Sequence, residues 1–131
     1  MAKMTVTFPE NKKVDASIHG LTIHTDQSVK AGGDGTAPAP FTLFLSSMAT
    51  CTGFYALAFC QKRDLPTDGM ELTLDTEKDP ETKMITKITM HLKTPDGFPV
   101  KYKNAILKSM NLCAVKKHLE KPPIIEIFTD I

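Results

Sequence analysis

The chain has 131 residues, of which 24% are charged, and its formal net charge is +1 at pH 7. This length predicts one domain, residues 1–131, and the near-neutral charge argues against an electrostatic surface for nucleic acid. Three cysteines are too few for a disulfide framework, and the N-terminus alternates in polarity instead of forming a secretory signal, so we expect a cytoplasmic protein.

The first part of the chain alternates apolar and polar residues, as half-buried strands do. Strands are predicted through residues 4–8, 14–18 and 21–23. Pro9-Glu10-Asn11 and His19-Gly20 are typical turn sequences, so the three strands predict an antiparallel meander. Residues 26–40 follow; they contain Gly32-Gly33-Asp34-Gly35 but neither phosphate-binding glycine pattern, and we interpret them as a mobile connection.

An uncharged stretch of twenty residues follows, from Phe41 to Cys60. Its length is sufficient to cross a bilayer, but serine, threonine and glycine dilute its apolarity. Because the flanking amphipathic strands need a core, we predict a buried central helix from Phe41 to Arg63, and no membrane partner. Asp64-Leu65-Pro66 ends this helix, since the residue before a proline avoids the helical region.

The second half of the chain alternates again and then changes to helical spacing. Strands are predicted at residues 70–74 and 88–92, with a turn at 79–82. Helices are predicted at 100–112 and 114–120, and a closing strand at 124–129. The predicted order is strands, one helix, strands, helices and a final strand. This order indicates an α+β fold.

Two cysteines, sixty-two positions apart, lie in unusual settings. Cys51 is in the middle of the predicted central helix, beyond the reach of the helix dipole, so its activation needs a cation or hydrogen-bond donor from elsewhere. Cys113 precedes a predicted helix start, near unpaired N–H groups, Lys116 and Lys117, which favour a lowered pKa. Together they fit a dithiol redox site, in which one thiolate attacks and the other resolves. Two inert buried thiols are the alternative.

The other chemistry-bearing residues favour simpler interpretations. Cys60 lies nine residues from Cys51 on the same helix, points to the opposite side, and is interpreted as a small buried apolar residue. The four histidines are scattered without metal-ligand spacing, so neither a metal site nor a cofactor is expected. Six lysines between residues 101 and 121 follow helix surfaces without interleaved aromatics, which indicates a solvated face.

Three ordered stretches resemble the OsmC/organic hydroperoxide resistance superfamily. Gly35-Thr36-Ala37-Pro38, followed by the apolar run to Cys51, resembles the G-T-x-P loop and cysteine helix of this family. Ile85-Thr86-Lys87-Ile88 resembles the strand after that helix, and Leu112-Cys113-Ala114-Val115-Lys116 resembles its C-P-V-S element. The resemblance extends from about residue 30 to about residue 125.

The resemblance implies an OsmC-like fold, with curved antiparallel sheets around the long central helix of an intertwined homodimer. It also implies a thiol-dependent peroxidase with peroxiredoxin-like activity, part of an oxidative stress response. Cys51 would attack an organic hydroperoxide, Cys113 would resolve the product, and a cellular dithiol would reduce the disulfide. Helical spacing adds four candidates for an apolar substrate pocket, whose alternative role is core or dimer packing: Phe41, Phe44, Met48 and Tyr55.

The chain departs from the peroxidase pattern at three places. Phe41 and Thr42 stand where the peroxidases have a glutamate, Ala114 replaces the proline, and the first hairpin has no arginine. Lys12 and Lys13 are the candidates for stabilising the thiolate in its place, although lysine lacks the planar fork of arginine. The alternative is an OsmC-like protein without strong peroxidase activity, which binds a small apolar or electrophilic ligand or senses redox state. A structural dimer with spectator cysteines is the simplest possibility.

Overall fold

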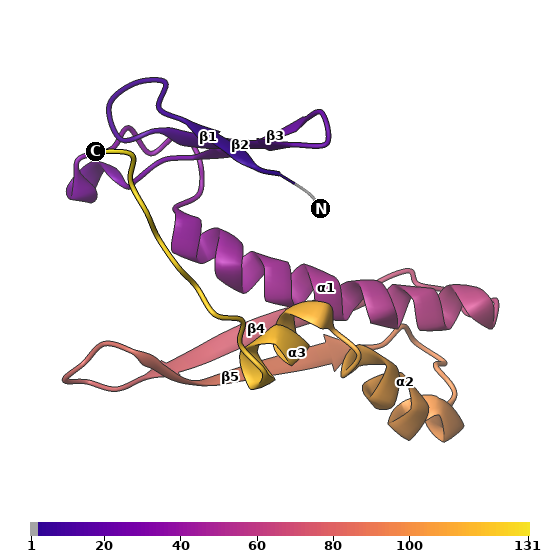
Figure 1. The fold of residues 1–131 in the computed structure, drawn as a ribbon. Helices are drawn as coiled ribbons and strands as arrows, with labels where there is room; N and C mark the ends of the chain where they lie inside the picture. The colour runs from indigo at the N-terminus through magenta and orange to yellow at the C-terminus, as the bar shows by residue number, and fades with distance from the viewer. Residues whose placement is uncertain (1–2) are drawn as a thin grey trace. The chain divides into compact units, whose positions relative to one another are not determined.

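The computed structural model describes residues 3–131 and divides the chain into two compact units, one ending at Ser46 and the other beginning at Ser47 (Figure 1). The first unit contains an antiparallel sheet with the strand order β1-β2-β3. Its strands are β1 (Thr5–Thr7), β2 (Val14–Ile18) and β3 (Leu21–Thr25). The predicted meander is confirmed. The single domain over residues 1–131 stays a prediction.

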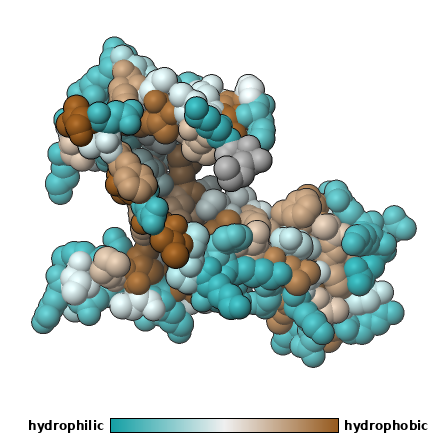
Figure 2. All heavy atoms as spheres, viewed as in Figure 1, coloured by the Kyte–Doolittle hydropathy of each residue, from teal (hydrophilic) through white to brown (hydrophobic). Residues whose placement is uncertain are grey.

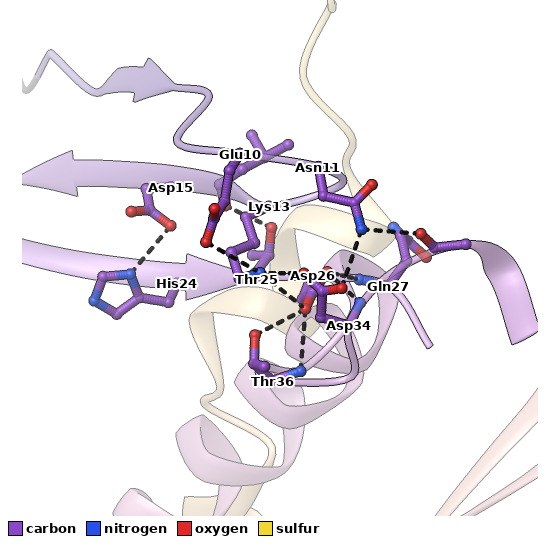
Figure 3. A network of polar contacts seen from close by, with 12 residues as sticks. Glu10, Asn11, Lys13, Asp15, His24, Thr25, Asp26, Gln27, Asp34 and Thr36 are labelled. Atoms are coloured by element: carbon purple, nitrogen blue, oxygen red, sulfur yellow. Dashed lines mark hydrogen bonds and ion pairs between the residues drawn. The ribbon is translucent and has the colours of Figure 1, made fainter. Parts of the chain in front are cut away.

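The loop after β3 is organised around Asp26, whose side chain is completely buried (Figure 3). Its carboxylate accepts hydrogen bonds from the N–H groups of Gln27, at 2.7 Å, and Thr36, at 3.0 Å, and from the Thr36 hydroxyl at 2.8 Å. Gly33 is required here, because a Cβ at this position would lie 2.1 Å from the Gln27 carbonyl oxygen. The connection is therefore held by specific contacts, and a short 3₁₀ turn covers Val29–Ala31.

Helix α1 runs from Pro40 to Lys62, within one residue of the predicted bounds. Proline fits the first turn because the missing N–H has no partner there. After the helix, Asp64 takes a left-handed conformation (φ 53°), and the Leu65 N–H donates to the Cys60 carbonyl at 2.9 Å, which closes the last turn.

Only one face of α1 is buried in the single chain: Met48, Thr52, Ala56, Phe59 and Cys60. Apolar side chains remain on other faces, including Phe54, which is 60% exposed. By length and composition the helix could cross a membrane, but the same properties are found in core helices. The expected complete burial is therefore not reached within the described residues of one chain.

The second unit pairs β4 (Glu71–Lys78) with β5 (Ile85–Lys93) in an antiparallel ladder. Their turn is fixed by Asp79, whose carboxylate accepts the N–H groups of Glu81 and Thr82 at 2.8 and 2.9 Å. A 3₁₀ turn, Val100–Tyr102, leads into α2 (Lys103–Met110), and α3 follows (Ala114–Glu120). The predicted helix over residues 100–112 is thus a 3₁₀ turn joined to a shorter α-helix.

The core of the second unit lies where α1, α2 and the β4–β5 sheet meet. Its buried members come from α1 and α2: Ala56, Phe59, Cys60, Ile106 and Met110. Leu72 and Leu92, which are register partners in the ladder, pack against this cluster from the sheet. The face of α1 that bears Phe59 is therefore anchored between a helix and a sheet.

The predicted closing strand at residues 124–129 is wrong for the single chain, since these residues have no regular secondary structure. The exposed apolar side chains of this segment are Ile124, Ile125, Ile127 and Phe128. Figure 2 shows hydrophobic residues, coloured brown, at the surface of the molecule. A strand forms only when a neighbouring edge supplies ladder hydrogen bonds. The apolar residues of this segment are typical of a strand, but no strand among residues 3–131 pairs with it.

Candidate functional site

Cys113 occupies the N-cap position of α3 and is completely buried. Its sulfur accepts a hydrogen bond from the Lys116 N–H at 3.4 Å, which satisfies one of the unpaired donors at the helix start. The thiol itself donates a long contact, 3.9 Å, to the carbonyl oxygen of Met48 on α1. The fold therefore inserts the start of α3 against the middle of α1.

Cys51 lies one turn of α1 from this contact, and its side chain hydrogen-bonds to the Cys113 sulfur. Cys51 is partly exposed, whereas Cys113 is not. Two thiols sixty-two positions apart are thus in contact, one open to solvent and one enclosed. Cys60 is also buried, but it belongs to the core cluster, where desolvation raises its pKa although Arg63 opposes the effect.

The surroundings of Cys113 favour its thiolate. Desolvation is the largest single influence and raises the pKa, but the groups around the sulfur, namely the Lys116 and Val115 N–H groups and the Thr52 and Cys51 side chains, together lower the pKa below its ordinary value. The donors that matter are backbone N–H groups and neighbouring side chains. The Lys116 ammonium is directed elsewhere, to the Asn111 side chain.

A cavity of about 300 Å³, formed by α1, β5 and α3, shares Met48 and Lys116 with the contacts of Cys113. Its lining is mainly apolar and includes Met48, Ile88, Met90 and Leu119, with Lys87 and Lys116 as its charged members. Met48 therefore contributes its carbonyl to the Cys113 contact and also helps line the cavity. Neither Cys51 nor Cys113 is among the residues that line this cavity.

The other apolar candidates are not brought to the cavity. Phe41 and Phe44 stack on each other at 5.4 Å between ring centroids, and Phe41 is 56% exposed. Tyr55 contacts its neighbour Phe54 edge to face at 5.3 Å. The substrate-binding role predicted for these three residues stays a prediction, and the observed ring contacts are also those of ordinary packing.

Lys13 lies among carboxylates within the first unit (Figure 3). Its ammonium pairs with Asp34, lies 3.7 Å from Glu10 and lies 4.0 Å from the buried Asp26. The hydrogen bond to Asp34 raises the Lys13 pKa, so this charge already has partners. Lys12 and Lys13 belong to the unit that does not contain the cysteines, and their thiolate-stabilising role stays a prediction.

One feature of the site was not predicted from the sequence. Thr52 is 4% exposed, follows Cys51 in the chain and is one of the groups around the Cys113 sulfur. A threonine in an apolar helix gives only a weak sequence signal, since it also occurs as a plain packing residue.

Comparison with known proteins identifies the family, which matches residues 33–128 under the description OsmC-like protein. The chain belongs to the OsmC-like protein family. The matched region contains α1, the β4–β5 hairpin and both cysteines of the contact described above. The expected family and the α+β fold class, with antiparallel sheets and a long helix, are confirmed.

Solved structures resemble this OsmC-like protein in fold at low sequence identity. An organic hydroperoxide resistance protein OsmC from Legionella pneumophila is 14% identical with a TM-score of 0.61, and the match covers 91% of this chain and 88% of that one. An OsmC-like protein from Mycoplasma pneumoniae is 15% identical with a TM-score of 0.69, covering 93% and 89%. The organic hydroperoxide resistance protein OhrB of Bacillus subtilis is 17% identical with a TM-score of 0.57, covering 93% and 92%.

No curated protein sequence matches the chain. The family membership supports the interpretation of α1 as the core helix of a small soluble fold. The cytoplasmic location stays a prediction.

Proposed function

We propose that this OsmC-like protein is a thiol-dependent peroxidase that reduces organic hydroperoxides through Cys51 and Cys113. The observation that carries the proposal is the contact between a partly exposed thiol and a buried thiol whose pKa is lowered. The names of the Legionella and Bacillus proteins, organic hydroperoxide resistance proteins, support the same substrate class.

Each thiol has a role that fits its exposure. Cys51 is reachable from solvent and attacks the peroxide, while the enclosed Cys113 resolves the product. The Cys51 thiol hydrogen-bonds to the Cys113 sulfur, so its proton has an acceptor at the moment of attack.

The cycle balances with two external reactants, a hydroperoxide and a dithiol. Cys51 transfers its proton to the Cys113 thiolate and attacks the outer peroxide oxygen, the O–O bond breaks, and the alkoxide takes up that proton and leaves as an alcohol. Cys51 is then a sulfenic acid, and the Cys113 thiolate attacks its sulfur and expels hydroxide, which solvent protonates to water. A cellular dithiol finally reduces the disulfide by exchange, gives up two electrons and becomes a disulfide itself.

The thiol count before and after oxidation tests the proposal. Addition of one equivalent of cumene hydroperoxide should remove two of the three free thiols and link Cys51 to Cys113. Cys51→Ser should abolish peroxide consumption, and Cys113→Ser should leave a sulfenic acid on Cys51 that dimedone traps. Cys60→Ala is the matched control and should consume peroxide normally. Three free thiols after treatment would refute the peroxidase.

A second candidate function is binding of an apolar ligand without catalysis. A separate cavity of about 410 Å³ lies between β5 and α2 and is lined by Phe98, Ile106 and other apolar residues, with Lys103 among its members. Its lining includes neither Cys51 nor Cys113. Binding of a fatty acid with equal affinity by wild type and Cys51→Ser, with no peroxide turnover, would favour this function.

We infer that the working unit is a homodimer. Exposed apolar side chains lie on α1, among them Phe41 and Phe54, and in the C-terminal segment, among them Ile127 and Phe128. Exposed apolar patches often mark protein–protein interfaces. A second copy covers such surfaces with complementary ones. Sedimentation at twice the 14.4 kDa mass of one chain supports the inference, and sedimentation as a monomer at micromolar concentration contradicts it.

A further inference from the structure

Thr52 is a buried threonine whose hydroxyl has no hydrogen-bond partner in the structure of residues 3–131. It is 4% exposed, and no group among residues 3–131 completes a hydrogen bond of ordinary geometry with its Oγ1. A threonine in a helix commonly donates to the carbonyl three or four residues earlier. Here that bond is not made, although a buried hydroxyl without a partner is unfavourable.

The position of Thr52 on α1 places its hydroxyl near the Cys113 sulfur. The residue four positions earlier on α1 is Met48, and the Met48 carbonyl oxygen is the atom that the Cys113 thiol contacts at 3.9 Å. The Cys113 sulfur therefore lies against α1 at the level of Thr52. The Thr52 hydroxyl acts on the Cys113 sulfur and helps to lower the pKa of that thiol.

We propose that Thr52 is the positioning residue of the thiol pair, whose hydroxyl turns to donate a hydrogen bond to the Cys113 sulfur when that sulfur becomes a thiolate. A hydroxyl rotor adapts without movement of the backbone, and catalytic hydrogen bonds are often incomplete before the charged state forms. The proposal rests on the peroxidase function, because it specifies which sulfur holds the negative charge between turnovers.

The other groups around the Cys113 sulfur do not provide a side-chain hydrogen bond to the thiolate after Cys51 has reacted. Cys51 from α1 is the titratable neighbour, and it loses its proton when it attacks. Lys116 from α3 contributes its backbone N–H, while its ammonium faces Asn111 and lies 3.8 Å from Glu120. Backbone donors hold the sulfur in every state. Of the two side chains in the described residues that lower the Cys113 pKa, Thr52 still has a proton to donate after Cys51 has reacted.

The test is a titration of each cysteine by NMR in protein labelled with ¹³C at the cysteine Cβ, in a Cys60→Ala background and without peroxide. Thr52→Val replaces the hydroxyl with a methyl of similar shape and should raise the Cys113 pKa. Thr52→Ser should restore the wild-type titration. Thr52→Ala, a second variant without the hydroxyl, should behave like Thr52→Val and serves if valine disturbs the fold.

Kinetics give the second measurement. At pH 7, disulfide formation after peroxide addition should slow about tenfold in Thr52→Val, since loss of a hydrogen bond to a charged group lowers the thiolate fraction by about that factor. The rates of variant and wild type should converge at high pH. An unchanged Cys113 titration in both Thr52→Val and Thr52→Ala would overturn the role of Thr52. Absence of peroxide consumption by the wild type would overturn the peroxidase instead, and the titration would still be informative.

Discussion

Oxidation of the thiol pair should stabilise the fold by an amount that follows from the chain separation. A disulfide between Cys51 and Cys113 closes a loop of sixty-two residues. The chain-entropy relation gives about 4 kcal/mol of stabilisation for a loop of this length, through restriction of the unfolded chain. Because the two side chains already contact each other in the reduced structure, little of this gain should be lost to rearrangement.

The assay is urea unfolding of the reduced and the peroxide-treated protein, at the same protein concentration and pH. Equal concentrations are needed because association also shifts the apparent stability. The oxidised form should unfold at higher urea, and the difference in free energy should be about 4 kcal/mol. Cys51→Ser should show no difference between treated and untreated protein, while Cys60→Ala should show the full difference.

Two results would refute this reasoning. A stabilisation below about 1 kcal/mol in protein shown by mass spectrometry to carry the Cys51–Cys113 bond would mean that the bond distorts the native fold. An equal stabilisation in Cys51→Ser would mean that oxidation acts elsewhere in the molecule. The first result would mean that the contact in the reduced structure does not match the geometry of the bonded pair. The second would separate that contact from the proposed redox cycle.

Three further predictions concern stability and assembly. Phe59→Ala should lower the free energy of unfolding by about 3–5 kcal/mol in urea, because it removes a side chain that is 4% exposed, whereas Met84→Ala, at a site 68% exposed, should change it by less than about 0.5 kcal/mol. Asp26→Asn should lower the thermal midpoint at pH 7, and the midpoint of the variant should decline less in acid than that of the wild type. The reason is that the Thr36 N–H lowers the Asp26 pKa in the folded state. The stability that the carboxylate contributes is therefore present above its unfolded pKa and disappears as the pH falls through the lower folded pKa. Removal of residues 124–131 should shift sedimentation towards the monomer, and an unchanged dimer would exclude this segment from the interface.

Much of the fold was predictable from local patterns. Alternation located the β2–β3 hairpin, and the uncharged run located α1 because only a core helix uses so long an apolar stretch in a soluble domain. Residues 124–129 show the limit of this method. Their pattern is that of a strand, but a strand needs a partner edge, and no local pattern reveals whether one chain provides it.

The site was predictable in its sulfur atoms but not in its electrostatics. A cysteine before a helix start is a recognisable cap, so the donors at Cys113 could be expected. The sequence placed the expected stabilising charge on Lys12 and Lys13, yet Lys13 pairs with carboxylates of its own unit. Thr52 could not be singled out, because its role depends on a contact with a residue sixty-one positions away.

Local sequence alone determined most helices and strands, although not the state of residues 124–129, and it determined that one thiol caps a helix, because periodicity and capping act between residues a few positions apart. Only the tertiary structure decided that Cys113 reaches α1 beside Cys51 and Thr52. The physical reason is that a thiol pKa depends on burial and on the donors around the sulfur, and both are set by packing between distant segments of the chain.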